Sequence, residues 1–212
     1  MSDIDLDGAV LMLMDMQNDF CHEEGVFARN GFGHMPAGAK AITPKIEAIA
    51  KACKRLRIPI VATKLLILDD LDGKGIGLSQ FRPNLQEFMV NEGFRKDSWG
   101  HDMTDEFKAD DTKPDYEVRK WGHSAMYLTE LEKVLQAIGA KTLIFVGLGT
   151  NGVIEGTARD AVSRGYKVIV VGDCATAPIQ ELHEGALRSL DHLGKVIDSQ
   201  TLLSELEQGA AA

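Results

Sequence analysis

The sequence predicts a single α/β domain over residues 1–212, with a six-stranded, mostly parallel sheet and helices on both faces in a three-layer, doubly wound, Rossmann-like arrangement. Three observations support this fold class. Short apolar runs alternate with longer amphipathic runs, which is typical of βα units. A chain of 212 residues can still build one hydrophobic core. Its 44% hydrophobic and 26% charged residues are the proportions of a globular protein.

The predicted strands are the short apolar runs, and the predicted helices are the longer amphipathic segments between them. We expect strands at residues 9–14, 59–66, 116–120, 143–147, 167–172 and 195–198. We expect helices at residues 42–57, 80–91, 127–139, 151–165, 179–193 and 201–207. Between residues 68 and 116 the pattern weakens, which indicates a segment that carries function or packs on a partner subunit.

The net charge of −9 argues against nucleic acid and anionic membranes as partners, because both favour a basic surface. A small-molecule ligand is the expectation. Cys21, Cys53 and Cys174 have neither disulfide nor zinc-ligand spacing, which fits a reducing compartment. The apolar run at residues 9–14 is too short to span a bilayer, so we expect a cytoplasmic protein. The histidines show no ligand pairing, and we expect neither a metal nor another cofactor.

Polar residues at the carboxyl ends of the strands are the candidates for chemistry, because ligands of parallel sheets bind there. Asp15 ends the first strand, where partial burial can raise the pKa of its carboxyl group toward a working acid or base. Lys120 ends the third strand, and its ammonium group can hold Asp15 ionised or share its proton. His123 follows closely and is a further acid/base candidate.

A glycine-rich turn follows the fourth predicted strand. Gly147, Gly149 and Gly152 have the G-x-G-x-x-G spacing, and Asp173 lies at the end of the next strand, as in dinucleotide-binding sites. That fingerprint normally belongs to the first βαβ unit, which argues against this interpretation. In either case the turn offers backbone N–H groups and a helix N-terminus to an anion or an oxyanion.

Taken together, three motifs resemble those of the isochorismatase-like (cysteine hydrolase) superfamily. They are Asp15-Met16-Gln17-Asn18-Asp19-Phe20, then Lys120 with Ser124-Ala125-Met126, and Gly147-Leu148-Gly149-Thr150-Asn151 leading into Glu155-Gly156-Thr157-Ala158-Arg159-Asp160-Ala161. The resemblance implies an Asp-Lys-Cys triad in which Asp15 and Lys120 fill the first two places. Val153 stands at the position of the nucleophilic cysteine. Valine has no nucleophilic atom, so the usual covalent route is closed.

The resemblance also assigns residues around the substrate. It implies that the cavity is lined by Phe20, Lys64, Trp121 and His123, and that the turn at Gly149 contributes. It further implies a cis peptide bond between Leu148 and Gly149 that aims the N–H groups of Gly149 and Val153 into the pocket. A second ammonium group at Lys64 would attract an anionic substrate.

Three functional hypotheses follow. The first is a hydrolase of a small, anionic molecule that works without a nucleophilic cysteine, in which Asp15 is the general acid/base and Lys120 its partner. Vinyl-ether hydrolysis is favoured here, because protonation by a carboxylic acid suffices. The second is a non-catalytic ligand-binding or scaffold relative, and the third is a dinucleotide-binding oxidoreductase that uses the glycine fingerprint. Family relatives commonly form dimers or tetramers, and Phe81, Phe88, Phe94 and Trp99 could cover a neighbour, so we expect a homo-oligomer.

Overall fold

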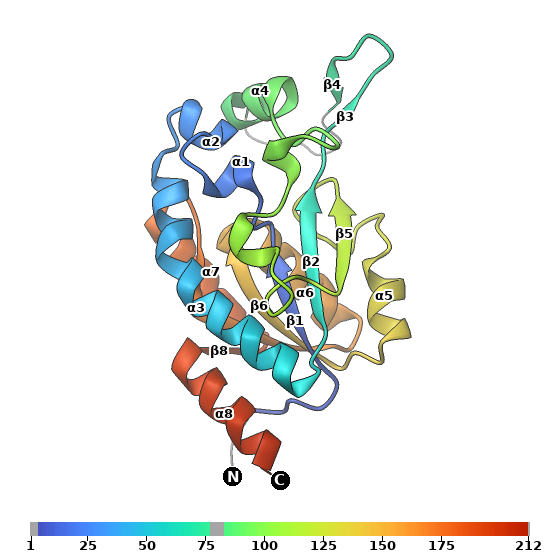
Figure 1. Ribbon diagram of the computed structural model, residues 1–212, viewed down its shortest axis with the longest axis vertical. Helices are drawn as coiled ribbons and strands as arrows, with labels where there is room; N and C mark the ends of the chain where they lie inside the picture. The colour runs from blue at the N-terminus through green and yellow to red at the C-terminus, as the bar shows by residue number, and fades with distance from the viewer. Residues whose placement is uncertain (1–3, 77–82, 212) are drawn as a thin grey trace.

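The computed structural model describes residues 4–76 and 83–211. Six parallel strands form the main sheet (Figure 1). They are β1 (Ala9–Met14), β2 (Ile60–Leu65), β5 (Tyr116–Lys120), β6 (Thr142–Leu148), β7 (Lys167–Thr176) and β8 (Lys195–Ile197). The strand order across the sheet is β5-β2-β1-β6-β7-β8. The chain starts at the central strand β1, adds β2 and β5 towards one edge, and then adds β6, β7 and β8 towards the other. The predicted fold class is therefore confirmed.

The central strands are apolar on both faces because helices cover both faces of the sheet. Every residue of β1 is buried, and successive side chains alternate between two hydrophobic cores. Leu11 and Leu13 pack on one side, whereas Met12 and Met14 pack on the other. This explains why the strand reads as a continuous apolar run.

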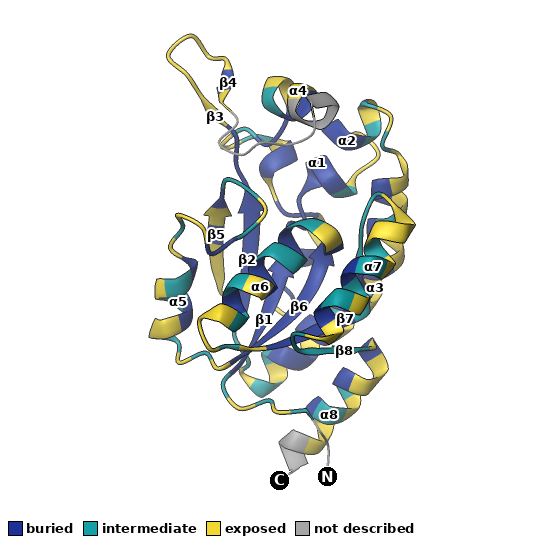
Figure 2. Cartoon of the chain, turned by 180° about the vertical axis from the view of Figure 1, so that it is seen from behind, coloured by how far each residue is buried: buried dark blue, intermediate teal, exposed yellow. Residues whose placement is uncertain are grey.

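The helices form the two outer layers. On one side, α3 (His34–Leu56) and α8 (Ser199–Ala211) contribute to the same core as Leu11. Figure 1 shows α3 in front of the sheet and α8 below it. On the other side, α5 (Leu131–Ala137), α6 (Glu155–Ser163) and α7 (Gln180–Asp191) share the core of Met12, and Figure 2 shows α6 crossing that face. The long α3 begins before the predicted helix at residues 42–57. Pro36 lies in its first turn, where proline is tolerated, and Pro44 lies in its interior.

Short elements gather over the carboxyl ends of the strands (Figure 1). These are α1 (Asn18–Cys21), α2 (Val26–Arg29), α4 (Pro83–Glu92) and the 3₁₀ helices η1 (Trp99–His101) and η2 (Asp105–Phe107). An antiparallel pair, β3 (Leu68–Asp69) and β4 (Gly75–Ile76), projects from this end. The first residues of the helix predicted at 80–91 lie outside the described residues.

Two of the four aromatic residues expected to cover a neighbouring subunit pack inside the chain instead. Phe88 and Phe94 are buried in the core beside α3, where the aromatic rings pack on one another, so they cannot supply an exposed interface. Phe81 lies outside the described residues. Trp99 is exposed. Over the described ranges, no helix is both long enough and apolar enough to cross a membrane.

Candidate active site

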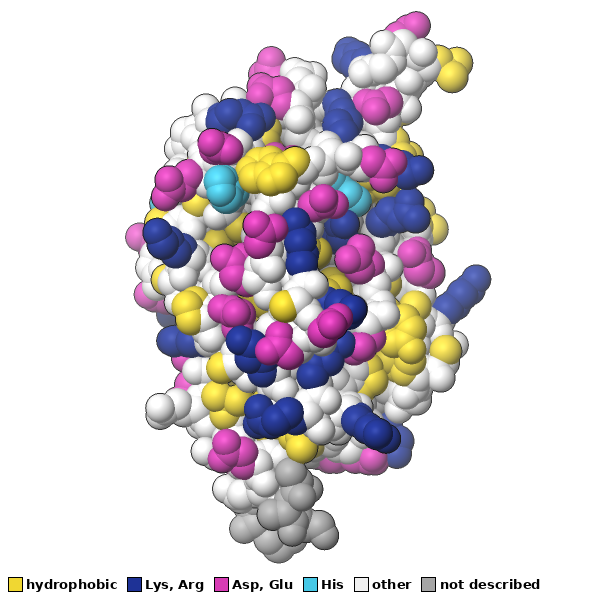
Figure 3. All heavy atoms as spheres, viewed as in Figure 1, with side chains coloured by type: hydrophobic (Ala, Val, Ile, Leu, Met, Phe, Trp, Pro, Cys, Tyr) yellow, Lys and Arg dark blue, Asp and Glu magenta, His cyan; other side chains and the backbone are white. Residues whose placement is uncertain are grey.

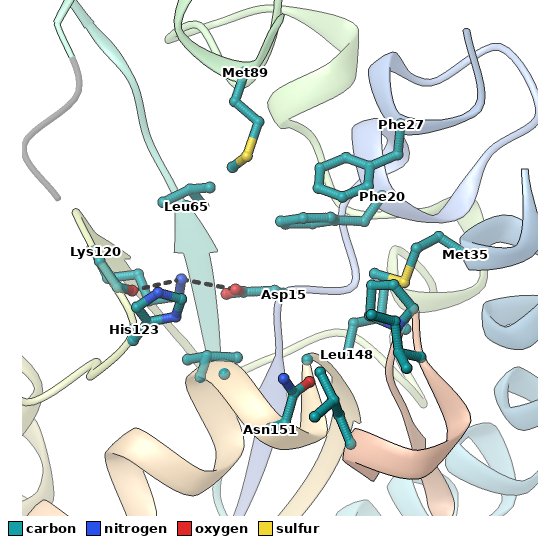
Figure 4. A pocket seen from close by; sticks show the side chains of 17 residues that line it. Asp15, Phe20, Phe27, Met35, Leu65, Met89, Lys120, His123, Leu148 and Asn151 are labelled. Carbon is teal, nitrogen blue, oxygen red and sulfur yellow. Dashed lines mark hydrogen bonds and ion pairs between the residues drawn. The ribbon is translucent and has the colours of Figure 1, made fainter. Parts of the chain in front are cut away.

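A cavity of about 370 Å³ opens at the carboxyl ends of β1 and β6, where the strand order reverses (Figure 4). This is the position at which doubly wound sheets bind ligands. Most of its lining is apolar. The described residues that line it are Asp15, Phe20, Phe27, Met35, Leu65, Met89, Lys120, Gly122, His123, Leu148, Gly149, Asn151, Gly152, Val153, Pro178, Ile179 and Leu182.

Asp15 directly follows β1 and has a left-handed backbone with φ of 52°. Aspartate tolerates this conformation better than most residues, and strained backbone is common at functional sites. The turn is held by two hydrogen bonds. The N–H of Asp15 donates to the carbonyl oxygen of Thr63 at 3.1 Å, and its carbonyl oxygen accepts from the N–H of Gln17 at 2.8 Å. The turn thus fixes the carboxylate at the edge of the cavity.

Lys120 reaches Asp15 across an intervening strand. It is the last residue of β5 and pairs in register with Leu65 of β2, which separates β5 from β1. Its Nζ lies 2.7 Å from Oδ2 of Asp15, and both side chains are almost completely buried (Figure 4). Nζ also donates to the carbonyl oxygen of Gly122 at 3.0 Å, and the Thr63 hydroxyl donates to Oδ1 of Asp15 at 2.7 Å. The structure thus brings together the two residues that sequence reasoning paired.

The electrostatics of the site are set by burial. Burial raises the pKa of Asp15, while the Lys120 ammonium and the Thr63 hydroxyl act in the opposite direction without cancelling it. Burial, and then the charge of Lys120, lower the pKa of His123, so its imidazole is neutral at neutral pH. Asp15 can therefore carry a proton more readily than a solvated carboxyl group, next to an uncharged imidazole.

Val153 lies where β6 meets α6. The connecting turn, η3 (Thr150–Ile154), is one turn of π-helix, and the buried side chain of Val153 lines the cavity. The predicted cis peptide bond is not present, because the bond between Leu148 and Gly149 is trans. Positive φ values at Gly147 and Gly149 turn the chain instead. The N–H of Gly149 donates to the carbonyl oxygen of Thr176 at 3.0 Å rather than into the cavity, which corrects the prediction for this group.

The dinucleotide interpretation does not fit the position of Asp173. Its carboxylate accepts hydrogen bonds from the N–H and the hydroxyl of Ser199, both at 2.7 Å, and lies 2.9 Å from Nζ of Lys45. These contacts tie β7 to α8 and α3. Asp173 thus has a structural role away from the cavity, and the glycine spacing at 147–152 serves the turn instead.

Three of the predicted substrate-binding residues line the cavity, and two do not. Phe20, His123 and Gly149 line it. Lys64 does not, because neighbouring residues of a strand point to opposite faces and Thr63 faces Asp15. Its Nζ lies 3.4 Å from Oε2 of Glu117. Trp121 is also outside the lining, and its indole N–H donates to the carbonyl oxygen of Leu128 at 3.3 Å.

Several residues of the first motif support the site without lining it. The Gln17 side chain accepts from the N–H of Leu65 at 2.7 Å and donates to the carbonyl oxygens of Leu65 and His101, each at 3.0 Å. Asp19 accepts from the N–H of Val26 at 3.1 Å and of Phe94 at 2.7 Å. The motif therefore holds β1, β2 and the overlying loops together.

The second and third motifs also bind each other. The Ser124 hydroxyl donates to Asp160, and the N–H of Ala125 donates to the Thr157 hydroxyl at 2.9 Å. These bonds fix the segment after Lys120 against α6. Within residues 4–76 and 83–211, no group of three or more His, Cys, Asp or Glu side chains could hold a metal ion.

Comparison with known proteins agrees with the motifs and the fold. A model of the isochorismatase domain matches residues 9–201. Ureidoacrylate amidohydrolase RutB of Methylorubrum extorquens is 28% identical, over 88% of this chain and 77% of the relative. Nicotinamidase 3 of Arabidopsis thaliana is 27% identical, over 86% and 80% of the two chains. The crystal structure of a cysteine hydrolase from Pseudomonas syringae pv. phaseolicola superimposes with a TM-score of 0.80 at 20% identity, covering 98% of this chain and 96% of that one. The family model spans nearly the whole chain, and the chain therefore belongs to the isochorismatase family, as its motifs predicted.

Proposed function

We propose that this isochorismatase-like hydrolase acts on a small molecule with Asp15 as general acid and base, and without a covalent intermediate on the protein. One observation carries the proposal: the buried pair of Asp15 and Lys120 faces a cavity whose described lining contains no serine, threonine or cysteine. The position of a nucleophile is taken by the hydrocarbon side chain of Val153. The described lining thus offers no hydroxyl or thiol nucleophile, and the chemistry we assign to Asp15 is proton transfer.

Hydrolysis of a vinyl ether, the favoured reaction, needs only what these residues supply. Protonated Asp15 gives its proton to the terminal carbon of the double bond, which leaves an oxocarbenium ion. Water adds to that ion, and its proton passes back to the Asp15 carboxylate. The resulting hemiketal then separates into a carbonyl compound and an alcohol. The raised pKa of Asp15 favours the first step, and Lys120 and Thr63 stabilise the carboxylate that it forms. Phe20, His123 and Gly149 would contact the substrate.

The test is turnover of vinyl ethers, amides, ureides and esters by the wild type and by Asp15→Asn. Asparagine keeps the shape of the side chain but cannot exchange the proton, so we expect the rate to fall about 10²- to 10⁴-fold. The matched control is Asp7→Asn, which changes an exposed aspartate paired with Lys141 and should leave the rate unchanged. An active Asp15→Asn variant would refute the mechanism, and an inactive wild type on every compound would favour the non-catalytic relative.

A second variant, Val153→Cys, separates proton transfer from the covalent route. The three natural cysteines lie outside the described lining of the cavity, so iodoacetamide should leave wild-type turnover unchanged. In Val153→Cys, the alkylated thiol should block the cavity and abolish turnover. If amide hydrolysis instead appears only in this variant, the chain is an amidase that has lost its nucleophile.

We also propose that the protein forms a homo-oligomer. Tyr116 on the edge strand β5 is exposed, as are Tyr127 and Leu128 between β5 and α5. Hydrophobic side chains also gather next to α5 on the face shown in Figure 3. Light scattering during size-exclusion chromatography should give a mass of at least twice 23.1 kDa.

A cytoplasmic location is proposed from the three free cysteines, and fractionation of the source cells tests it.

A further inference from the structure

The cavity has a polar side and a larger apolar side. Figure 4 shows Lys120 and His123 together on one side of Asp15, and Phe20, Phe27 and Met35 on the other. The rings of Phe20 and Phe27 have their centroids 4.8 Å apart at an angle of 48°. The apolar wall is assembled from α1, α2, α4 and the first turn of α3, which lie at the carboxyl ends of the strands.

The charges of the lining offer no site for an anion. Lys120 is the one cation among the described lining residues, and its ammonium group is already 2.7 Å from the Asp15 carboxylate. No arginine and no second lysine belongs to this described lining. Lys64, expected to attract an anion, lies outside it and beside Glu117 and Asp102. A carboxylate or phosphate on the substrate would therefore compete with the Asp15 carboxylate for this single ammonium group, or be buried without a counter-charge, which is unfavourable.

We propose that the substrate is electrically neutral and carries a bulky apolar group, such as a six-membered carbocycle, that fills the side of the cavity at Phe20 and Phe27. Its reacting group lies next to Asp15. The assignment of the reacting group rests on the proposed function, whereas the binding preference rests on the lining alone. A volume of about 370 Å³ holds a ligand of this size. Met35 and Met89 have flexible side chains, which can adapt the wall to its outline.

Titration calorimetry of the wild type with matched probes tests this preference. Cyclohexanecarboxamide and cyclohexanecarboxylate share one shape and differ in charge, and we expect the neutral amide to bind about 10-fold more tightly or better. Acetamide lacks the ring and should bind more weakly than the cyclic amide. Equal or tighter binding of the carboxylate, or no binding of either cyclic probe, would overturn the proposal. Because binding is measured without turnover, an inactive enzyme leaves this result intact.

A positive charge introduced at the opening of the cavity tests whether the probes bind there. Leu182 on α7 lines the cavity and is 47% exposed, so Leu182→Arg adds a guanidinium at the opening without burying it. This variant removes the same apolar contact for both probes, so it should raise the affinity for the carboxylate relative to that for the amide about 5-fold. The matched control is Leu71→Arg, at a fully exposed leucine in the projecting turn between β3 and β4, which should change neither affinity. Equal effects in the two variants would show that the probes do not occupy this cavity.

Discussion

Replacing Lys120 by methionine tests whether the ion pair with Asp15 is buried and coupled. Methionine keeps the length of the side chain but removes the charge 2.7 Å from Oδ2 of Asp15. Both side chains are nearly inaccessible to water, and the loss of one partner leaves the other as an unpaired buried charge. Such losses cost about 3–5 kcal/mol. We therefore expect urea unfolding at pH 7 to show a free energy of unfolding lower by about this amount.

The loss should depend on pH in a defined direction. Removal of the ammonium that lowers the pKa of Asp15 leaves burial unopposed except by Thr63, so the pKa in the folded variant rises above its wild-type value. Because the pKa of Asp15 is higher in the folded than in the unfolded chain, its protonation stabilises the folded state. This stabilisation is fully present below the pKa of an aspartate in the unfolded chain, about 3.9. That contribution is lost as the pH rises through the folded pKa. In the pH range between the pKa of Asp15 in the folded wild type and that in the folded variant, only the variant gains a proton as the pH falls. The difference in free energy of unfolding between the two proteins should therefore shrink by about 1.4 kcal/mol per pH unit of acidification.

The control is Lys141→Met, which removes the same group from an ion pair of the same length. Lys141 lies 2.7 Å from Asp7, but both side chains are largely exposed, so its loss should be undetectable at either pH. The measurement is urea unfolding of the wild type and of both variants at pH 7 and pH 5, and the quantity compared is the free energy of unfolding that each variant loses. A small, pH-independent loss for Lys120→Met would refute the buried, coupled pair and with it the proposed control of the Asp15 proton.

Two further predictions concern the surroundings of Asp15. In Thr63→Val, the hydroxyl that lowers the pKa of Asp15 is lost, so the alkaline limb of the profile of kcat/KM against pH should move to higher pH; an unmoved limb would mean that Asp15 does not act as the acid. In Gly147→Ala, the added Cβ would lie 2.3 Å from the carbonyl oxygen of Met14, so thermal and urea unfolding should show a loss of more than about 3 kcal/mol or no folded protein. Gly73→Ala, also at positive φ but with no described atom within 4 Å, should lose only about 1–2 kcal/mol, and similar losses in both would exclude the clash.

The sheet and the pairing of Asp15 with Lys120 could be predicted because simple rules determine them. Central parallel strands are buried on both faces and therefore appear as apolar runs, which identified β1, β2, β6 and β7. The edge strands β5 and β8 were also predicted, but β5 is largely exposed and β8 is half-buried. The carboxyl ends of parallel strands share one edge of the sheet, so Asp15 and Lys120 lie at the same edge, and the long lysine side chain spans the strand between them. β7 nevertheless continues to Thr176, past the predicted end at residue 172, because its register shifts opposite Gly147 and pairing resumes beyond the irregularity.

The apolar wall could not be predicted in the same way. Phe27, Met35 and Met89 come from separate helices, and buried apolar residues at a cavity look in sequence like any other core residues. Lys64 was misplaced for a related reason. Thr63 and Lys64 are adjacent polar residues on β2, and only the register with β1 decides which of the two faces Asp15. The hydroxyl faces the carboxylate, and the ammonium faces Glu117 on the neighbouring strand.

The valine at position 153 links the proposed reaction to the proposed substrate. Val153 is 4% exposed and belongs to the same hydrophobic core as Met14 and Phe145, so its methyl groups join the packed layer between the sheet and α6. A thiol here would offer the cavity a nucleophile, whereas valine presents only hydrocarbon to it. The same residue thus removes the covalent route and makes the cavity less favourable to charge. A neutral substrate that needs only protonation satisfies both conditions at once, whereas an anionic amide satisfies neither.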